Sequence, residues 1–292
     1  MNGAGFRFAA HAPRLVVYTD LDGTLLDHHD YSWQAAGPAL HRLAAMGLPV
    51  VPVTSKTVAE LWGLRERIGL TGPFAVENGG AIVVPARYFG ANEGEPLEQA
   101  PAPGYWLQRL GPPYADILEK LRALRSRGYR FLGFADMSDT QVAEHTGLSL
   151  TGASLARQRL CSEPLIWQDD ETSLEAFREA LHAAGLSSRQ GGRFLHVMGL
   201  CDKGAALQRL QTRFAVAPGG TGGEGGLTLA CALGDSPNDF DMLAMAQRAA
   251  LVQRPGGDYA APADPPRLIH AGAPGPVGWC LAVNAWLDEY SL

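Results

Sequence analysis

The amino-acid sequence predicts an α/β fold in which a parallel-sheet core is interrupted by an inserted α+β domain. In the first and last thirds of the chain, short apolar runs alternate with amphipathic stretches of helical length, as in strand–helix–strand units. The middle third has a mixed pattern, and a segment rich in Pro, Gly and polar residues precedes it. We therefore expect residues 1–86 and 198–292 to form the core and residues 87–197 to form the inserted domain.

The first core elements follow one another as strand, turn and helix. Leu15–Thr19 is a short apolar run that ends in acidic residues, as expected of a buried parallel strand that opens into a loop. Apolar residues recur at helical spacing in Trp33–Met46 and again from Val58 to Ile68. Pro49–Val53 is a second apolar strand, and Phe74–Val76 is the end of a third. This order predicts a sheet whose loops open at one edge.

Helical and strand patterns also alternate in the remainder of the chain. The expected helices are Tyr114–Arg127, Ser173–Ala184 and Lys203–Phe214, and the expected strands are Arg130–Phe134, Leu165–Trp167, Arg193–Val197 and Leu227–Leu233. The Gly-rich stretch at 218–226 lacks the Lys-Ser/Thr of a phosphate-binding loop and precedes a strand. We interpret it as a flexible linker.

Composition limits the classes of partner. The formal net charge is −6, and no run of Lys or Arg offers a broad surface for nucleic acid or an anionic membrane. No stretch approaches the roughly 18 continuous apolar residues of a membrane span. The four cysteines are scattered without metal-ligand spacing, which is typical of reduced thiols in a cytosol. We expect a cytoplasmic protein, either monomer or homodimer, that binds a small molecule.

Carboxylates mark the ends of two predicted strands. Asp20 and Asp22 follow the first strand, and Asp235 follows the strand near residue 230. A phosphate monoester dianion repels a carboxylate nucleophile, so Asp20 can attack phosphorus only if a hard cation neutralises both groups. Mg²⁺ prefers oxygen ligands and needs only a few from the protein, and Asp20 and Asp235 offer them. Asp22 can then protonate the leaving oxygen and later deprotonate the attacking water.

Two further residues complete this constellation. The hydroxyl of Thr54, at the end of the second strand, can donate to a phosphoryl oxygen. Lys203, at the start of a helix, can offset the negative charge of Asp20 and the phosphoryl group. Taken singly, these acids are also typical of turns and helix caps, and such a lysine is typical of a solvated helix start. Their occurrence together in this order favours the catalytic interpretation.

This set of motifs resembles the haloacid dehalogenase superfamily over nearly the whole chain. The matching segments are 20–24 (DLDGT), Thr54, Lys203 and 234–239 (GDSPND). The resemblance implies a Rossmann-like parallel-sheet core, an inserted cap and an aspartyl-phosphate intermediate. It also implies Mg²⁺ held by Asp20, the Asp22 carbonyl and Asp235, with Asn238 and Asp239 supporting the ion or its waters.

A narrower resemblance is to the mannosyl-3-phosphoglycerate phosphatases. Segments 54–57 (TSKT), 77–80 (ENGG), 191–194 (GGRF) and 274–279 (PGPVGW) carry it, and in 159–164 (RLCSEP) an Arg and a Glu of the family's acidic run remain. The resemblance implies that substrate-binding residues are Ser55, Lys56, Glu77, Asn78, Arg159, Glu163, Gly192 and Arg193.

The expected activity is that of a phosphoric monoester hydrolase, which converts mannosyl-3-phosphoglycerate to mannosylglycerate and phosphate. Three alternatives remain open at this point. The first is a phosphatase acting on a broader range of sugar phosphates, including glucosyl-3-phosphoglycerate. The second is a phosphomutase, which returns the phosphoryl group to a sugar. The third is a sensor of phosphorylated metabolites without catalytic activity.

Overall fold

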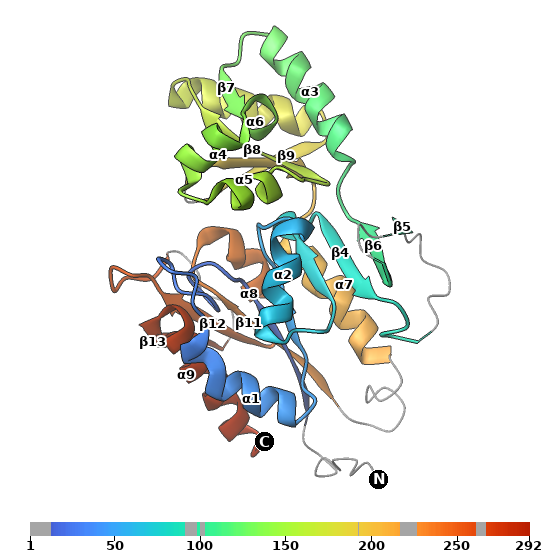
Figure 1. Ribbon diagram of the computed structural model, residues 1–292, viewed down its shortest axis with the longest axis vertical. Helices are drawn as coiled ribbons and strands as arrows, with labels where there is room; N and C mark the ends of the chain where they lie inside the picture. Colours follow the sequence, from blue (N-terminus) through green and yellow to red (C-terminus); the bar gives the residue numbers. More distant parts are fainter. Residues whose placement is uncertain (1–12, 91–97, 100–102, 192, 217–226, 261–266) are drawn as a thin grey trace. The chain divides into compact units, whose positions relative to one another are not determined.

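The computed structural model confirms the predicted α/β fold class (Figure 1). It describes residues 13–90, 98–99, 103–191, 193–216, 227–260 and 267–292, so the predicted linker at 218–226 lies outside the described residues. The chain divides into two compact units. The first draws on Met1–Val53, Arg87–Glu95 and Leu207–Leu292, and the second on Thr54–Ala86 and Pro96–Ala206. The core and cap boundaries expected from sequence remain a prediction.

The first unit contains a five-stranded sheet with the order β13-β12-β11-β1-β2. Its strands are β1 (Arg14–Thr19), β2 (Val50–Pro52), β11 (Thr228–Gly234), β12 (Arg248–Gln253) and β13 (Leu268–Pro274), and every neighbouring pair is parallel. The chain passes from β1 to β2 on one side and later enters β11 on the other. In such sheets ligands bind at the carboxyl ends of the strands where the order reverses, here between β1 and β11.

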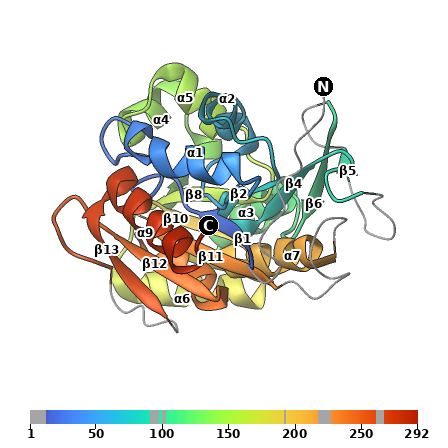
Figure 2. The ribbon, with the colours of Figure 1, turned by 90° about the horizontal axis from the view of Figure 1, so that it is seen from below.

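Helices pack against this sheet. α1 (Gly37–Ala45) and α9 (Gly275–Glu289) lie side by side (Figure 2), and the Arg42 guanidinium donates to Asn284 at 2.6 Å and to Asp288 at 2.9 Å. α8 (Phe240–Met245) packs on β11 and β12. The helix expected from Trp33 begins only at Gly37, after a 3₁₀ turn, because Pro38 lacks an N–H and fits only the first helical turn.

The second unit contains two antiparallel sheets. The first has the order β3-β4-β6-β5 and is built from β3 (Phe74–Val76), β4 (Ala81–Pro85), β5 (Glu98–Gln99) and β6 (Tyr105–Arg109). The other has the order β7-β8-β10-β9 and is built from β7 (Phe131–Gly133), β8 (Ser162–Trp167), β9 (Leu186–Gln190) and β10 (Leu195–Gly199).

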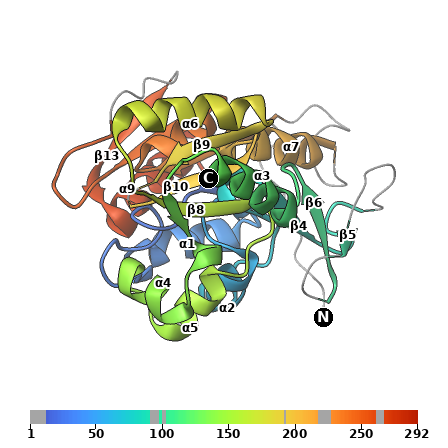
Figure 3. The same ribbon diagram turned by 90° about the horizontal axis from the view of Figure 1, so that it is seen from above.

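Apolar cores on both faces hold the second of these sheets in place. α3 (Tyr114–Ser126) and α6 (Glu171–Ala183) pack on one face through residues such as Leu121 and Phe177 (Figure 3). α4 (Asp139–Thr146) and α5 (Leu150–Ala156) form a smaller core with Phe134 on the opposite face. The pattern of sequence periodicity did not indicate these two short helices. Ser138 and Ser149 cap their N-termini, and the side chains of these two residues accept backbone N–H groups of the first turns.

Two helices lead into or out of the regions that carry the predicted site. α2 (Val58–Ile68) is capped by Thr57, whose hydroxyl accepts the Glu60 N–H while the Glu60 carboxylate accepts the Thr57 N–H, a reciprocal capping box. α7 (Lys203–Val216) starts in the second unit and ends in the first. In the described part of the chain, no helix has both the length and the apolar character needed to cross a membrane. All four cysteines are free thiols.

Candidate active site

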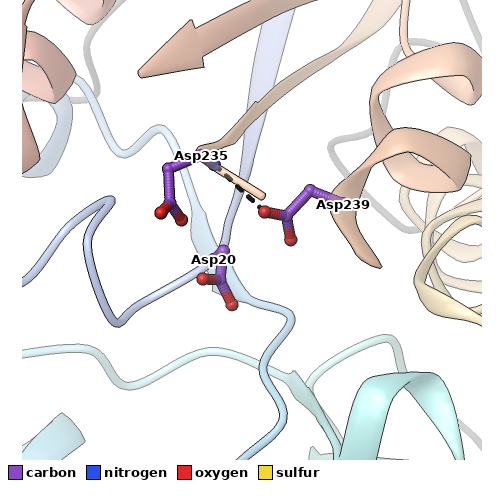
Figure 4. Close-up of side chains that lie close together, drawn as sticks. All are labelled: Asp20, Asp235 and Asp239. Carbon is purple, nitrogen blue, oxygen red and sulfur yellow. Dashed lines mark hydrogen bonds between the residues drawn. The ribbon is translucent and has the colours of Figure 1, made fainter. Parts of the chain in front are cut away.

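Three carboxylates meet where the strand order reverses. Asp20 directly follows β1, Asp235 directly follows β11, and Asp239 ends the 3₁₀ turn after it. One oxygen from each lies within 4.8 Å of the others, and the three residues are 6%, 8% and 0% exposed (Figure 4). Thr19 and Leu233 are paired in the register, so β1 and β11 bring their following residues to the same level of the sheet.

Hydrogen bonds fix Asp235 and Asp239 in this arrangement. Asp239 Oδ2 accepts the backbone N–H groups of Asp235 and Ser236, both at 3.0 Å, and the Ser236 hydroxyl lies 3.1 Å from it. The Ser236 hydroxyl also lies 2.5 Å from Asn238 Oδ1. Asn238 and Asp239 therefore belong to the same turn as Asp235, and the turn orients their side chains.

The loop that follows β1 is tied to Asp235. The Thr24 hydroxyl donates to Asp235 Oδ1 at 3.0 Å, and Gly23 has a positive φ of 82°. A Cβ at Gly23 would lie 2.8 Å from Asp235 Oδ2, so this close approach requires glycine. The half-buried Asp22 lies in this loop, two residues after Asp20. Sequence reasoning assigned no role to Thr24, although its place within the quoted DLDGT motif was a signal.

The chemistry of this cluster fits a divalent cation. Carboxylates this close and this buried repel one another unless a positive charge lies between them. An all-oxygen set of Asp20, Asp235 and Asp239 suits Mg²⁺, which takes one or two carboxylates directly and keeps several waters. The residues that can hold such an ion are therefore the three aspartates, with Asn238 in the supporting turn.

The other predicted site residues belong to the second unit, except Gly192, which lies outside the described residues. Thr54 is buried, and its hydroxyl oxygen accepts the Lys56 N–H at 3.2 Å. The Asn78 N–H donates to the Thr54 carbonyl at 2.9 Å. Ser55 and Lys56 are half-buried in the same loop. The structure thus joins the loop after β2 to the Glu77–Gly80 segment.

Lys203 lies beside this segment. The positive φ of 87° at Gly79 and a hypothetical Cβ only 2.1 Å from the Asp202 carbonyl show how closely the two segments pack. Lys203 is fully buried at the first turn of α7. Within the second unit, the predicted residues Thr54, Asn78 and Lys203 therefore lie in contacting segments.

Glu77 is the centre of a buried polar network. Its Oε1 accepts the Leu160 N–H at 2.7 Å, and its Oε2 accepts the Cys161 N–H at 3.0 Å and the Ser162 hydroxyl at 2.7 Å. The Arg159 guanidinium lies 3.6 Å from Oε2 and donates to the Ser55 carbonyl at 3.2 Å. Glu77 and Arg159 thereby hold segment 159–162 against the loop that contains Thr54.

Two further predicted residues have local partners in the cap-like part of the second unit. Glu163 accepts the Tyr114 hydroxyl at 2.7 Å and the Ala135 N–H at 2.8 Å, and burial raises the pKa of its carboxyl. The exposed Arg193 donates to the His145 and Thr146 carbonyls at the end of α4. The substrate-binding roles of Glu163 and Arg193 stay predictions.

His196 adds a neutral group to the same unit. Burial, followed by the positive charges of Arg159 and Lys203, lowers the pKa of its imidazole to about 3. The ring is therefore uncharged at neutral pH.

The chain is similar to two curated relatives over nearly its full length. It is 36% identical over 273 residues to a glucosyl-3-phosphoglycerate/mannosyl-3-phosphoglycerate phosphatase of Methanococcoides burtonii, covering 92% of this chain and 95% of the relative. It is 35% identical over 276 residues to a protein of the same name from Persephonella marina, covering 94% and 98%. No family model matches the chain.

The fold is similar to that of solved structures. A sugar phosphatase of haloacid dehalogenase subclass IIB superposes with a TM-score of 0.59 at 14% identity, covering 94% of this chain and 98% of that one. At this level of identity the likeness concerns the fold, and the sequence relatives carry the closer relationship.

Proposed function

Because this chain belongs to the glucosyl-3-phosphoglycerate/mannosyl-3-phosphoglycerate phosphatase family of the haloacid dehalogenase superfamily, we propose that its substrate is a glycosyl-3-phosphoglycerate. The chain is a phosphoric monoester hydrolase of the sugar-phosphatase kind. Its preferred substrate in this proposal is mannosyl-3-phosphoglycerate, with the glucosyl compound second. The observation that carries the proposed chemistry is the buried cluster of Asp20, Asp235 and Asp239 where the strand order reverses.

The proposed reaction has two steps. A carboxylate oxygen of Asp20 attacks phosphorus, the bond between phosphorus and the leaving oxygen breaks, and the Asp22 carboxylic acid gives that oxygen a proton. Water then attacks the aspartyl phosphate while Asp22 takes its proton, which releases inorganic phosphate and restores Asp20. The roles assigned to Thr54 and Lys203 are donation to the phosphoryl oxygens and compensation of their charge.

The three-aspartate cluster would hold Mg²⁺, which when bound supplies the positive charge that lets a carboxylate approach an anionic phosphate. The chain itself contributes the turn at 234–239. The turn presents Asp235 and Asp239 together because one carboxylate oxygen of Asp239 accepts the backbone N–H groups of Asp235 and Ser236.

Chelation of divalent metal should abolish phosphate release, and added Mg²⁺ should restore it. Asp239→Asn should raise the Mg²⁺ concentration needed for half-maximal activation about 10- to 100-fold, because the amide supplies no negative charge. Mg²⁺ titrations of phosphate release measure this shift. The control is Asp288→Asn, which changes an exposed carboxylate in the same unit. Full activity of the chelated protein would contradict the proposed metal requirement.

A panel of phosphorylated metabolites tests the substrate. We expect the highest kcat/KM for mannosyl-3-phosphoglycerate, a lower value for the glucosyl compound, and far lower values for hexose phosphates. The panel contains 3-phosphoglycerate as well, which distinguishes recognition of the whole glycoside from recognition of its phosphorylated half. A simple hexose phosphate turned over faster than both glycosides would overturn the proposed substrate and leave the phosphatase chemistry intact.

Arg193→Ala should lower kcat/KM for the glycosyl-3-phosphoglycerate about 10- to 100-fold, the size expected when a charged hydrogen bond is lost. Turnover of an aryl phosphate, which lacks the sugar and the glycerate, should change little. The matched control is Arg130→Ala, which removes another exposed arginine of the same unit, paired with Asp169. If Arg193 acts only on the α4 carbonyls, both substrates should lose activity equally.

A further inference from the structure

A buried chain of hydrogen bonds links α9 to the backbone of the proposed nucleophile. The Trp279 indole N–H donates to Thr19 Oγ1 at 3.0 Å, and the Thr19 hydroxyl donates to the Asp20 carbonyl at 2.6 Å. Trp279 and Thr19 are both 0% exposed, and both belong to the first unit. These two hydrogen bonds therefore connect α9, through the interior, to the residue that follows β1.

The direction of these hydrogen bonds follows from the groups. An indole nitrogen only donates, whereas a hydroxyl has one proton and two lone pairs. The indole N–H occupies a lone pair of Thr19, so the single hydroxyl proton points to the Asp20 carbonyl. Without the indole, this hydroxyl loses the partner that sets its direction.

The backbone of Asp20 is held from its other side as well. The Asp20 N–H donates to the Leu233 carbonyl of β11 at 3.0 Å. Both the N–H and the carbonyl of Asp20 thus have buried partners, one from the neighbouring strand and one from the Trp279–Thr19 pair. Because both backbone groups of Asp20 are held, its side chain has fewer orientations available. Reaction rates depend steeply on how a nucleophile is aligned with the atom it attacks.

We propose that Trp279 is a positioning residue that, through Thr19, holds Asp20 in the orientation needed to attack phosphorus. The inference rests on the proposed role of Asp20 but not on the identity of the organic group. Trp279 and Thr19 are both fully buried, and in this proposal they act through Asp20 and not on the substrate directly. Their removal should therefore act on the chemical step and leave binding of the substrate and of Mg²⁺ nearly unchanged.

The test compares two buried tryptophans of the same helix. Trp279→Phe should lower kcat about 10- to 100-fold for an aryl phosphate, with KM and half-maximal Mg²⁺ changed less than about 2-fold. Trp286→Phe is the matched control, because Trp286 is also buried in α9 and its indole N–H has no acceptor among the described residues. It removes the same indole volume and should leave kcat near the wild-type value.

Thr19→Val tests the hydrogen-bond chain from Trp279 to Asp20 without altering α9. It removes the hydroxyl while keeping the side-chain shape, and it should lower kcat as much as Trp279→Phe. The double variant should be no slower than the slower single variant, because both changes break one chain. Thr19→Ser, which restores the hydroxyl, should regain most of the rate.

Three results would overturn the proposal: equal loss of kcat in Trp279→Phe and Trp286→Phe, multiplied losses in the double variant, or an unchanged kcat in Thr19→Val. Thermal unfolding of each variant shows whether a change in kcat accompanies a general loss of structure. Because the assay uses an aryl phosphate, a wrong assignment of the glycosyl substrate would leave all of these results interpretable.

Discussion

Asp20→Asn should lower phosphate release by at least about 10³-fold while the protein stays folded, because an amide cannot form the acyl phosphate. The substitution keeps the shape of the side chain, so the hydrogen bonds of the Asp20 backbone to Leu233 and Thr19 remain possible. Steady-state assays on both the glycosyl substrate and an aryl phosphate measure the loss. Both substrates should be affected equally, since the nucleophile serves each.

Two controls make this result specific. Asp30→Asn removes an exposed carboxylate later in the same segment and should leave turnover unchanged. Rapid quenching of the wild-type protein in acid, followed by mass spectrometry, should detect one phosphoryl group on the peptide that contains Asp20. Residual turnover of Asp20→Asn near the wild-type rate, or a phosphoryl group on another residue, would remove Asp20 from the proposed role.

Glu77→Gln should lower the free energy of unfolding by about 3–5 kcal/mol, the largest effect on stability that we expect from a single isosteric change. Each carboxylate oxygen accepts at least one donor, and together they accept Leu160 N–H, Cys161 N–H and the Ser162 hydroxyl. Whichever oxygen becomes an NH₂ group then opposes a donor, and Arg159 keeps a buried charge without its carboxylate.

The backbone conformation at Glu77 adds to the expected loss of stability. Glu77 has a positive φ of 52°, a conformation that costs free energy for a residue other than Gly or Asn and that its surroundings must therefore hold. The side-chain bonds of Glu77 supply part of that hold. Loss of these bonds should also release segment 160–162 from the Thr54 loop, so activity should fall together with stability.

Urea unfolding of Glu77→Gln and of a matched control measures the difference. Glu98→Gln is that control, because its carboxylate is half exposed and pairs with Arg109 at 3.0 Å. An exposed ion pair contributes at most about 1 kcal/mol, so Glu98→Gln should change stability little. If the two variants have the same unfolding free energy, the network at Glu77 contributes no special stability.

Much of the parallel sheet could be predicted because its strands are buried on both faces. The runs that end near Thr19 and Leu233 are continuously apolar, and each leads directly into an aspartate. This combination is visible in the sequence without knowledge of contacts. The start of α1 was predicted less well: the helical pattern extends back to Trp33, whereas the helix begins at Gly37 after a 3₁₀ turn, and such a turn depends on local packing.

In the candidate site, too, some features could be predicted from the sequence and others could not. Asp20 and Asp235 were predicted as neighbours from their positions after strands, and Asp239 completes the cluster because its turn bonds back to Asp235. The contacts of Glu77 could not be predicted, because its partners lie more than eighty residues away in the chain. The same holds for Trp279, which reaches Thr19 across a separation of 260 residues.

The sequence by itself determined the fold class, the order of the motifs and the identity of the acids, because strand periodicity and residue chemistry are local properties. Only the tertiary structure decided which polar groups are partners. Burial strongly favours donors and acceptors in the interior that have a partner, and that partner is set by packing between distant segments. The roles of Glu77 and Trp279 were therefore inferred from their contacts in the fold. The role of Asp20 could be inferred from its place after an apolar strand.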